Sequence, residues 1–275
     1  MPSELINNYF RTETLPHIWC PGCGNGIVTR AIVKAIDNLN IPKDDVCIVS
    51  GIGCSSRAAG YLDFNTLHTT HGRALAFATG VKLANPKLHV IVITGDGDAS
   101  AIGGNHLIHS ARRNIDITTV VFNNSIYGMT GGQYSPTTPM GDKATTAPYG
   151  SIDPNFDLCE LANAAGATYV ARGTVYAVNI LEKVIQEGIS NKGFSFIEAI
   201  ATCPTYYGRK NKKGSAVDMI KFLKEHGVMY TAWQKMSEDE KIGKFPIGKL
   251  YTKERKEYTE QYQMLIDSLG KESNQ

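Results

Sequence analysis

Two short apolar segments each run into a cluster of polar residues, and this arrangement constrains the fold more than any other feature of the chain. Residues 90–94 lead into Gly-Asp-Gly-Asp, and residues 118–122 lead into Asn-Asn-Ser-Ile. The 25 residues between Gly97 and Asn123 are enough for one helix and a return to the sheet. In a parallel strand–helix–strand unit, the carboxyl ends of both strands face one crevice.

The polar clusters offer ligands for a divalent metal and a diphosphate. Asp96 supplies a carboxylate oxygen and Asn124 an amide oxygen, which suit Mg²⁺ when phosphates and water complete its shell. Gly95 and Gly97 allow the backbone to turn tightly and approach phosphates. Gly-Asp-Gly alone is typical of an ordinary turn after a buried strand. With the second strand, the spacer and the Asn pair, the pattern favours a cofactor site and resembles the thiamine-diphosphate motif.

Six cysteines fall into two groups. Four lie in loop-like contexts rich in Gly or Pro, namely Cys20, Cys23, Cys54 and Cys203. Cys47 lies in an apolar strand segment and Cys159 in a helical one, and we expect both to be small buried hydrophobic residues. Four loop thiolates can bind Zn²⁺ or an iron–sulfur cluster.

Other uses of these thiols fit less well. A second Cys-x-x-Cys, which a zinc ribbon would need, is absent from the sequence. Trp-Cys-Pro-Gly-Cys is similar to a thioredoxin site, but the 19 residues before Cys20 contain no clear apolar strand to carry it. A disulfide framework is not expected in a chain of 275 residues with no signal peptide.

Composition excludes some partners and sets the expected compartment. The net charge of +2 implies no nucleic-acid partner and no anionic membrane surface. The apolar runs are too short to span a bilayer, and the first residues contain no apolar signal core. We therefore expect a cytoplasmic protein, whose reducing surroundings suit exposed thiolates.

Periodicity predicts alternating strands and helices. Strands are expected over residues 46–50, 89–94, 117–122, 168–171 and 194–200, and helices over residues 25–39, 73–84, 102–113, 158–165 and 178–188. This alternation predicts an α/β fold with a doubly wound, mostly parallel sheet. Residues 131–157 have little periodicity, which is typical of a functional or partner-bound loop. Residues 205–275, basic at first and then charged and aromatic, are predicted to form an extension without a strong strand.

Several motifs in order resemble the β subunits of 2-oxoacid:ferredoxin oxidoreductases, with the 2-oxoglutarate branch the most similar. They are Trp19-Cys-Pro-Gly-Cys-Gly24, Gly51-Ile-Gly-Cys-Ser-Ser-Arg57, Thr70-His-Gly-Arg73, Gly95-Asp-Gly-Asp98, Asn123-Asn-Ser-Ile-Tyr-Gly-Met-Thr-Gly-Gly-Gln133 and Cys203-Pro. The resemblance covers about residues 15–210. It implies a thiamine-diphosphate-binding fold, with the cofactor and iron–sulfur domain in residues 1–204 and an extension in 205–275 that wraps a partner or covers the site.

The resemblance also implies roles for particular residues. A [4Fe–4S] cluster would be held by Cys20, Cys23, Cys54 and Cys203. Mg²⁺ would be held by Asp96, Asn124 and the carbonyl of Ile126. Thiamine diphosphate would contact Ile52, Gly53, Cys54, Ser55, His71, Gly95, Gly97, Asp98, Gly128, Met129 and Thr130. His71 would also act at the diphosphate or the reacting centre, although a histidine in such a turn is otherwise typical of a protein surface.

Arg57 is the candidate for substrate selectivity. A guanidinium binds a carboxylate through two hydrogen bonds, so Arg57 could take the distal carboxylate of 2-oxoglutarate. Pairing with a structural acid or with a partner chain is an equal alternative. Pyruvate and branched-chain 2-oxoacids remain open as substrates.

One catalytic part is missing from the chain. Thiamine enzymes use a glutamate against the aminopyrimidine ring, and residues 47–156 contain none. The family supplies it from an α subunit, so we expect an obligate partner. The implied reaction is the CoA-dependent oxidative decarboxylation of 2-oxoglutarate to succinyl-CoA and CO₂, with electrons passed through the cluster to ferredoxin.

Features of the sequence also match two other classes of function. Gly51-Ile-Gly-Cys-Ser-Ser partly matches the nicotinamide-dehydrogenase motif, but the third glycine is missing and no acid follows at the required strand end. A non-catalytic module that binds zinc through its cysteines is the other alternative.

Overall fold

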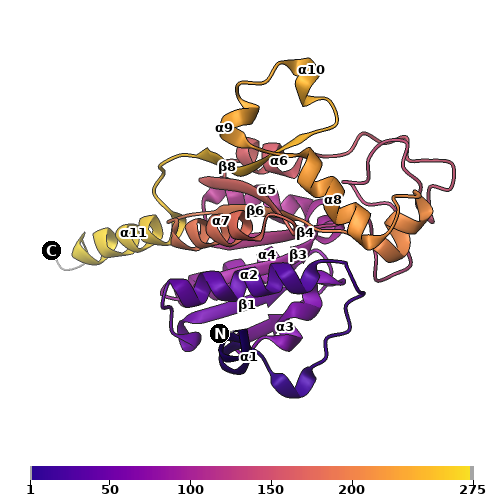
Figure 1. Ribbon diagram of the computed structural model, residues 1–275. Coiled ribbons are helices and arrows are strands. Elements are labelled where there is room, and N and C mark those ends of the chain that lie inside the picture. The colour runs from indigo at the N-terminus through magenta and orange to yellow at the C-terminus, as the bar shows by residue number, and fades with distance from the viewer. Residues whose placement is uncertain (1, 273–275) are drawn as a thin grey trace.

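The computed structural model describes residues 2–272, and one mixed sheet forms their centre (Figure 1). Its strands are β1 (Val46–Ser50), β2 (Asn65–His68), β3 (His89–Gly95), β4 (Thr118–Asn123), β5 (Tyr169–Thr174), β6 (Ser195–Ile200), β7 (Gly227–Met229) and β8 (Phe245–Thr252). The strand order is β2-β1-β3-β4-β6-β5-β8-β7. The strands from β2 to β5 in that order run parallel, and β8 pairs antiparallel with β5.

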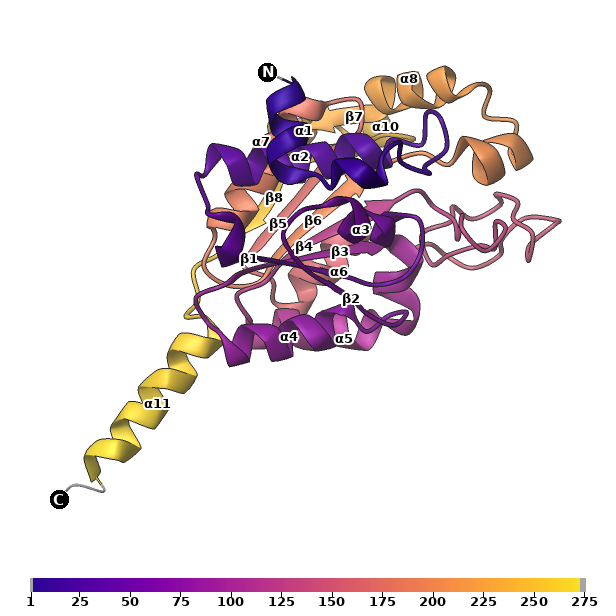
Figure 2. The ribbon, with the colours of Figure 1, turned by 90° about the horizontal axis from the view of Figure 1, so that it is seen from below.

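Helices cover both faces of the sheet (Figure 2). They are α1 (Pro2–Tyr9), α2 (Asn25–Asn38), α3 (Ala58–Tyr61), α4 (Ala74–Ala84), α5 (Gly104–Arg113), α6 (Leu158–Ala165), α7 (Val178–Ser190), α8 (Ala216–His226), α9 (Tyr230–Trp233), α10 (Glu238–Lys241) and α11 (Tyr258–Glu272). Helices α2 and α7 build one hydrophobic core against the sheet, and α4, α5 and α6 build a second core on the other face. Because both faces are covered, every residue of β1, β4 and β5 is buried.

Local sequence signals set the limits of several helices. The Asp157 side chain caps α6 by accepting the N–H groups of Cys159 and Glu160. Gly166 ends that helix in the left-handed region at φ 106°. Asn114 ends α5 in the same way at φ 55°.

The predicted doubly wound, mostly parallel α/β fold is confirmed. The strands expected over 46–50, 89–94, 117–122, 168–171 and 194–200 are β1, β3, β4, β5 and β6. The helix expected over 102–113 is preceded by a π-helical turn, Asp98–Ile102, and α5 itself begins at Gly104. Such turns are frequent at functional sites. Residues 131–157 form neither helix nor strand, as expected.

The expectation that residues 205–275 lack a strong strand is wrong. Strand β8 extends the sheet beyond β5, and β7 pairs with β8. Pro246 and Gly248 conceal this strand in the sequence, because both residues are unfavourable inside a regular strand. Gly248 adopts φ +102°, and the pairing of β8 with β5 shifts register nearby. Residues 1 and 273–275 of the two expected domains lie outside the described residues.

The last helix leaves the body of the protein. Helix α11 extends away from the sheet (Figure 2). Across residues 2–272, no helix combines the length and the apolar character that crossing a bilayer requires.

Strand β8 can be tested by truncating a buried side chain. Leu250 is 7% exposed and belongs to the second core. We expect Leu250→Ala to lower the free energy of unfolding by about 2–5 kcal/mol, as for other buried leucines. The exposed neighbour Lys249 pairs with Glu187 at the surface, so Lys249→Ala should change it by less than about 1 kcal/mol. Urea unfolding followed by circular dichroism measures both variants, and equally small effects would contradict the packing of β8.

Candidate functional site

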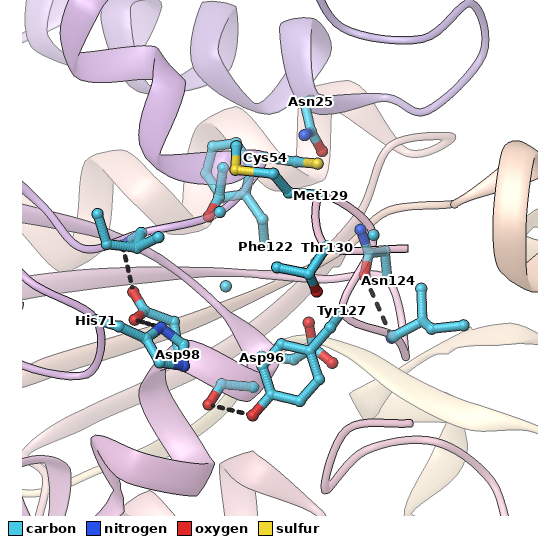
Figure 3. Close-up of a pocket in the computed structure, with 17 residues that line it drawn as sticks. Asn25, Cys54, His71, Asp96, Asp98, Phe122, Asn124, Tyr127, Met129 and Thr130 are labelled. Atoms are coloured by element: carbon cyan, nitrogen blue, oxygen red, sulfur yellow. Dashed lines mark hydrogen bonds and ion pairs between the residues drawn. The ribbon is translucent and has the colours of Figure 1, made fainter. Parts of the chain in front are cut away.

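A pocket lies at the carboxyl ends of β1, β3 and β4 (Figure 3). Of the residues predicted to bind cofactor or metal, its walls bring together Ile52, Gly53, Cys54, Ser55, His71, Gly95, Asp96, Gly97, Asp98, Asn124, Ile126, Gly128, Met129 and Thr130. Three further lining residues have no counterpart among the predictions, namely Asn25, Phe122 and Tyr127. Among residues 2–272, Arg57 is not one of those that line this pocket.

The buried carboxylate of Asp98 joins the loops that form one wall. Its Oδ2 accepts hydrogen bonds from Thr94 Oγ1 at 2.7 Å and from the N–H of Ile52 at 3.1 Å. Its Oδ1 accepts the N–H of Gly72 at 2.6 Å and lies 2.6 Å from Nδ1 of His71. Asp98 therefore lines the pocket with both of its oxygens bonded to protein groups, and its contact with the cofactor stays a prediction.

Two glycines are required by close contacts in the same wall. A Cβ atom on Gly51 would lie 1.8 Å from Oδ2 of Asp98. A Cβ atom on Gly97 would lie 2.3 Å from the ring of Tyr127, whose hydroxyl donates to the carbonyl oxygen of Gly97 at 3.1 Å. Only glycine permits these approaches, which leave loop backbone at the pocket surface for a phosphate.

Asp96 lines the pocket and is 3% exposed. Its Oδ2 accepts hydrogen bonds from Ser135 Oγ at 2.5 Å and from Thr137 Oγ1 at 2.6 Å. Burial raises the pKa of Asp96 to about 6, although these hydrogen bonds oppose the shift. A nearby cation would favour the ionised carboxylate.

The turn after β4 places the other predicted metal ligands on this pocket. Oδ1 of Asn123 accepts the N–H of Ser125 at 3.0 Å, and Oδ1 of Asn124 accepts the N–H of Ile126 at 3.3 Å. Ser125 adopts the left-handed region at φ 60°. Asparagine side chains bonded to backbone two residues ahead stabilise such turns, and this turn holds Asn124 and Ile126 at the pocket with Asp96.

Hydrogen bonds hold together the three segments that carry the loop cysteines. The indole Nε1 of Trp19 donates to the carbonyl of Cys54 at 2.6 Å. The backbone N–H of Thr202 donates to the carbonyl of Cys23 at 3.1 Å, and its hydroxyl donates to the carbonyl of Gly22 at 2.7 Å. The segments around Cys20, Cys54 and Cys203 are therefore joined by protein contacts alone.

The thiols of these segments affect one another. A Cβ atom on Gly128 would lie 3.6 Å from both Sγ of Cys54 and Sγ of Cys203. Burial, with smaller contributions from Cys203 and Cys23, raises the pKa of the Cys54 thiol to about 11, while Arg57 lowers it. Burial also raises the pKa of Cys23, to which Cys20 and Cys203 contribute. All of these cysteines are free.

The remaining cysteines are buried, as predicted. Cys47 is 7% exposed in β1, and Cys159 is 1% exposed in α6. Sγ of Cys159 also lies 3.5 Å from Oε2 of Glu198.

Comparison with known proteins identifies the family. Residues 51–199 match the family described as thiamine pyrophosphate enzyme, C-terminal TPP binding domain. The chain is 57% identical to the 2-oxoglutarate synthase subunit KorB of Methanocaldococcus jannaschii, covering 96% of this chain and 98% of that one. It is 54% identical to KorB of Methanothermobacter marburgensis, covering 96% and 93%. The chain belongs to the β subunits of the 2-oxoacid:ferredoxin oxidoreductases.

A solved structure agrees with this membership. It is the 2-oxoglutarate:ferredoxin oxidoreductase from Magnetococcus marinus with 2-oxoglutarate, coenzyme A and succinyl-CoA bound. The TM-score is 0.85 at 31% identity, covering 96% of this chain and 90% of that one. The predicted family is confirmed, and the nicotinamide dehydrogenase and the zinc-binding module are excluded.

The pocket fits the diphosphate end of the cofactor and its metal. The buried Asp96 carboxyl group, with a pKa of about 6, offers an oxygen to a divalent cation. Oδ1 of Asn25 and Oγ of Ser55 are buried in the pocket walls without a hydrogen-bond partner among residues 2–272. Because buried polar atoms are normally bonded, both are suited to bonding a bound group.

The four loop thiols fit a metal cluster by the same reasoning. They are buried or half-buried, apart from the exposed Cys20. Raised pKa values at Cys54 and Cys23 mean that the protein alone disfavours thiolates there. Bound iron would favour them, because thiolates are the ligands of iron–sulfur clusters.

Sequence reasoning assigned no role to Tyr127 or Asn25. Tyr127 lies inside the motif of residues 123–133, and Asn25 directly follows the motif of residues 19–24 at the start of α2. These positions were a usable signal. Their contacts, such as that of Tyr127 with Gly97, depend on the tertiary structure.

The cluster can be tested with a matched pair of cysteine variants. Complex purified without oxygen should be brown and should bleach with dithionite. Cys54→Ser should lose most of its iron and visible absorption, because a hydroxyl is a poor cluster ligand, whereas Cys47→Ser in β1 should keep both. Iron and sulfide analysis with visible spectroscopy measures the result. Unchanged iron in Cys54→Ser, or a colourless wild-type complex with full activity, would refute the cluster assignment.

Proposed function

We propose that this chain is the β subunit of a 2-oxoglutarate:ferredoxin oxidoreductase. With an α subunit, it would convert 2-oxoglutarate, CoA and oxidised ferredoxin to succinyl-CoA, CO₂ and reduced ferredoxin, reversibly. The observation that carries this proposal is the 57% identity, over nearly the whole of both chains, to a protein named 2-oxoglutarate synthase subunit KorB. The similar solved enzyme, which has 2-oxoglutarate and succinyl-CoA bound, supports the same substrate.

The residues of the pocket are suited to holding the cofactor in place. When bound, thiamine diphosphate supplies a nucleophilic carbon and an electron sink in its thiazolium ring. Asp96, Asn124 and the carbonyl of Ile126 would hold Mg²⁺ against the diphosphate. Nδ1 of His71 lies 2.6 Å from Oδ1 of Asp98, so Nε2 would be the ring nitrogen that faces the bound group.

Cys54 supports a short path for electrons out of the pocket. Cys54 lines the pocket, its sulfur lies near that of Cys203, and the thiols of Cys20 and Cys23 affect its pKa. A cluster held by Cys20, Cys23, Cys54 and Cys203 would therefore border the reacting centre. Electrons would then leave toward ferredoxin without crossing the rest of the chain.

The composition of the pocket supports an obligate partner. Its lining within residues 2–272 includes aspartates and no glutamate. The glutamate that faces the aminopyrimidine ring would come from the α subunit, together with much of the substrate pocket. A cytoplasmic location would suit the reactive thiols, since the cytosol keeps them reduced.

The substrate assignment is tested with the assembled enzyme. Complex of the α and β subunits, purified without oxygen, is assayed with CoA, a viologen acceptor and a panel of 2-oxoacids. We expect the highest kcat/KM for 2-oxoglutarate. A higher kcat/KM for pyruvate or a branched-chain 2-oxoacid would support the reaction class but contradict the assignment of 2-oxoglutarate as the substrate. No reduction of viologen with any 2-oxoacid would overturn the function itself.

Arg57 is proposed to bind the distal carboxylate of 2-oxoglutarate. It lies three residues after Cys54 and affects the electrostatics of that thiol. Loss of a charge-assisted bidentate contact should raise KM for 2-oxoglutarate roughly 10- to 100-fold in Arg57→Ala, and much less for pyruvate. Arg113→Ala, on the exposed side of α5, is the control and should change neither constant. Equal changes in KM for both substrates would remove Arg57 from the selectivity of the enzyme.

A further inference from the structure

The long loop of residues 131–157 returns to the metal-binding side of the pocket. Near the start of the loop, Ser135 and Thr137 are only 2% and 4% exposed, whereas residues of a surface loop are usually exposed to solvent. The N–H of Ser135 donates to Thr138 Oγ1 at 2.8 Å, and the N–H of Thr138 donates to the carbonyl of Ser135 at 3.0 Å. These reciprocal bonds make the turn rigid before any ligand binds.

Thr137 contacts both strands that carry the proposed Mg²⁺ ligands. Its Oγ1 lies 2.6 Å from Oδ2 of Asp96, after β3, and 3.0 Å from Oδ1 of Asn123, at the end of β4. Both neighbours are acceptors, so the single hydroxyl proton is shared between them. The neighbouring Thr138 hydroxyl donates to the carbonyl of Ser125 at 2.7 Å. The loop is thus bonded to Asp96 and to the turn that carries Asn124 and Ile126.

The orientation of Asn123 is itself held by buried charges. Its Nδ2 donates to Oε1 of Glu198 at 2.7 Å, which directs Oδ1 toward Thr137 and the N–H of Ser125. Oε2 of Glu198 accepts a hydrogen bond from Nε of Arg172 at 2.5 Å, and the side chains of both residues are at most 6% exposed. The position of Thr137 is therefore fixed against strands β4, β5 and β6.

This arrangement bears on the kind of metal that the site accepts. Mg²⁺ requires nearly ideal octahedral geometry with ligands at about 2.0–2.1 Å, whereas Ca²⁺ tolerates variable geometry at longer distances. A hydroxyl that spans two ligand-bearing segments limits their separation. Loss of this hydroxyl would weaken the binding of Mg²⁺ more than the binding of Ca²⁺.

We propose that Thr137, assisted by Ser135, is a positioning residue that sets the spacing between Asp96 and the Asn124–Ile126 turn and thereby the preference of the site for Mg²⁺. This inference rests on the proposed function, because Asp96, Asn124 and Ile126 hold Mg²⁺ only in that function. Thr137 would act through Asp96 and Asn123 and not as a ligand of the metal.

The test measures metal-dependent cofactor binding rather than turnover. Complex of the α and β subunits is stripped of cofactor and divalent metal with a chelator. It is then titrated with Mg²⁺ or with Ca²⁺ at saturating thiamine diphosphate, by calorimetry or tryptophan fluorescence. Thr137→Val removes the hydroxyl at nearly constant shape, and Thr137→Ser restores it. Thr145→Val is the loop control, because within residues 2–272 that exposed hydroxyl donates only to the carbonyl of Gly131.

We expect Thr137→Val to raise the half-saturating Mg²⁺ concentration about 10- to 100-fold, as for other residues that orient metal ligands. The Ca²⁺ value should change by much less, and Thr137→Ser and Thr145→Val should behave as wild type. Unchanged Mg²⁺ dependence in Thr137→Val, or an equal loss for Mg²⁺ and Ca²⁺, would overturn the proposal.

Two further measurements keep the result interpretable. Visible absorption of the cluster shows whether each variant is folded, and Ser135→Ala removes the other donor to Asp96 if Thr137→Val does not fold. Ser135→Ala should weaken the binding of Mg²⁺ more than the binding of Ca²⁺. A half-saturating Mg²⁺ concentration equal to that of the wild type would contradict the proposal. A wild-type complex that takes up no thiamine diphosphate with Mg²⁺ would overturn the proposed function instead.

Discussion

The pocket depends on the buried carboxylate of Asp98. Its bonds to Thr94, Ile52 and Gly72, and its contact with His71, join the loops that follow three neighbouring strands. A parallel sheet brings these loops to one edge, but it does not fix their separation. The Asp98 carboxylate supplies that fixed separation, and the bare backbone of Gly51 makes room for it. The remaining features of the site are arranged around this wall.

Both halves of the proposed chemistry meet at one loop. Cys54 lies in the loop after β1, which Asp98 holds through Ile52 and which Trp19 holds through the carbonyl of Cys54. The same few residues thus border the cofactor pocket and the group of loop thiols. An electron donor and an acceptor held by one short rigid loop keep a nearly constant separation, which suits transfer between them.

The fold and most of the pocket could be predicted because their signals are local. Asp96 and Asn124 each follow an apolar strand directly, and strand topology alone then brings them together. Ser135 and Thr137 could not be found in this way, because they reach Asp96 from 39 and 41 residues away through a loop without periodicity. Strand β8 was not predicted for a different reason, because Pro246 and Gly248 reduce its local strand preference. The assignments missed were therefore those that depend on tertiary contacts or that have a weak local signal.

The separation of the loop cysteines along the chain has a consequence for biosynthesis. Cys20 and Cys23 are translated before the first strand of the sheet, but Cys203 is translated only after β6. The full sulfur set exists only after β6 has formed and Thr202 has docked on the Cys20–Cys23 segment. Iron would therefore be delivered only after β6 and Cys203 have been translated.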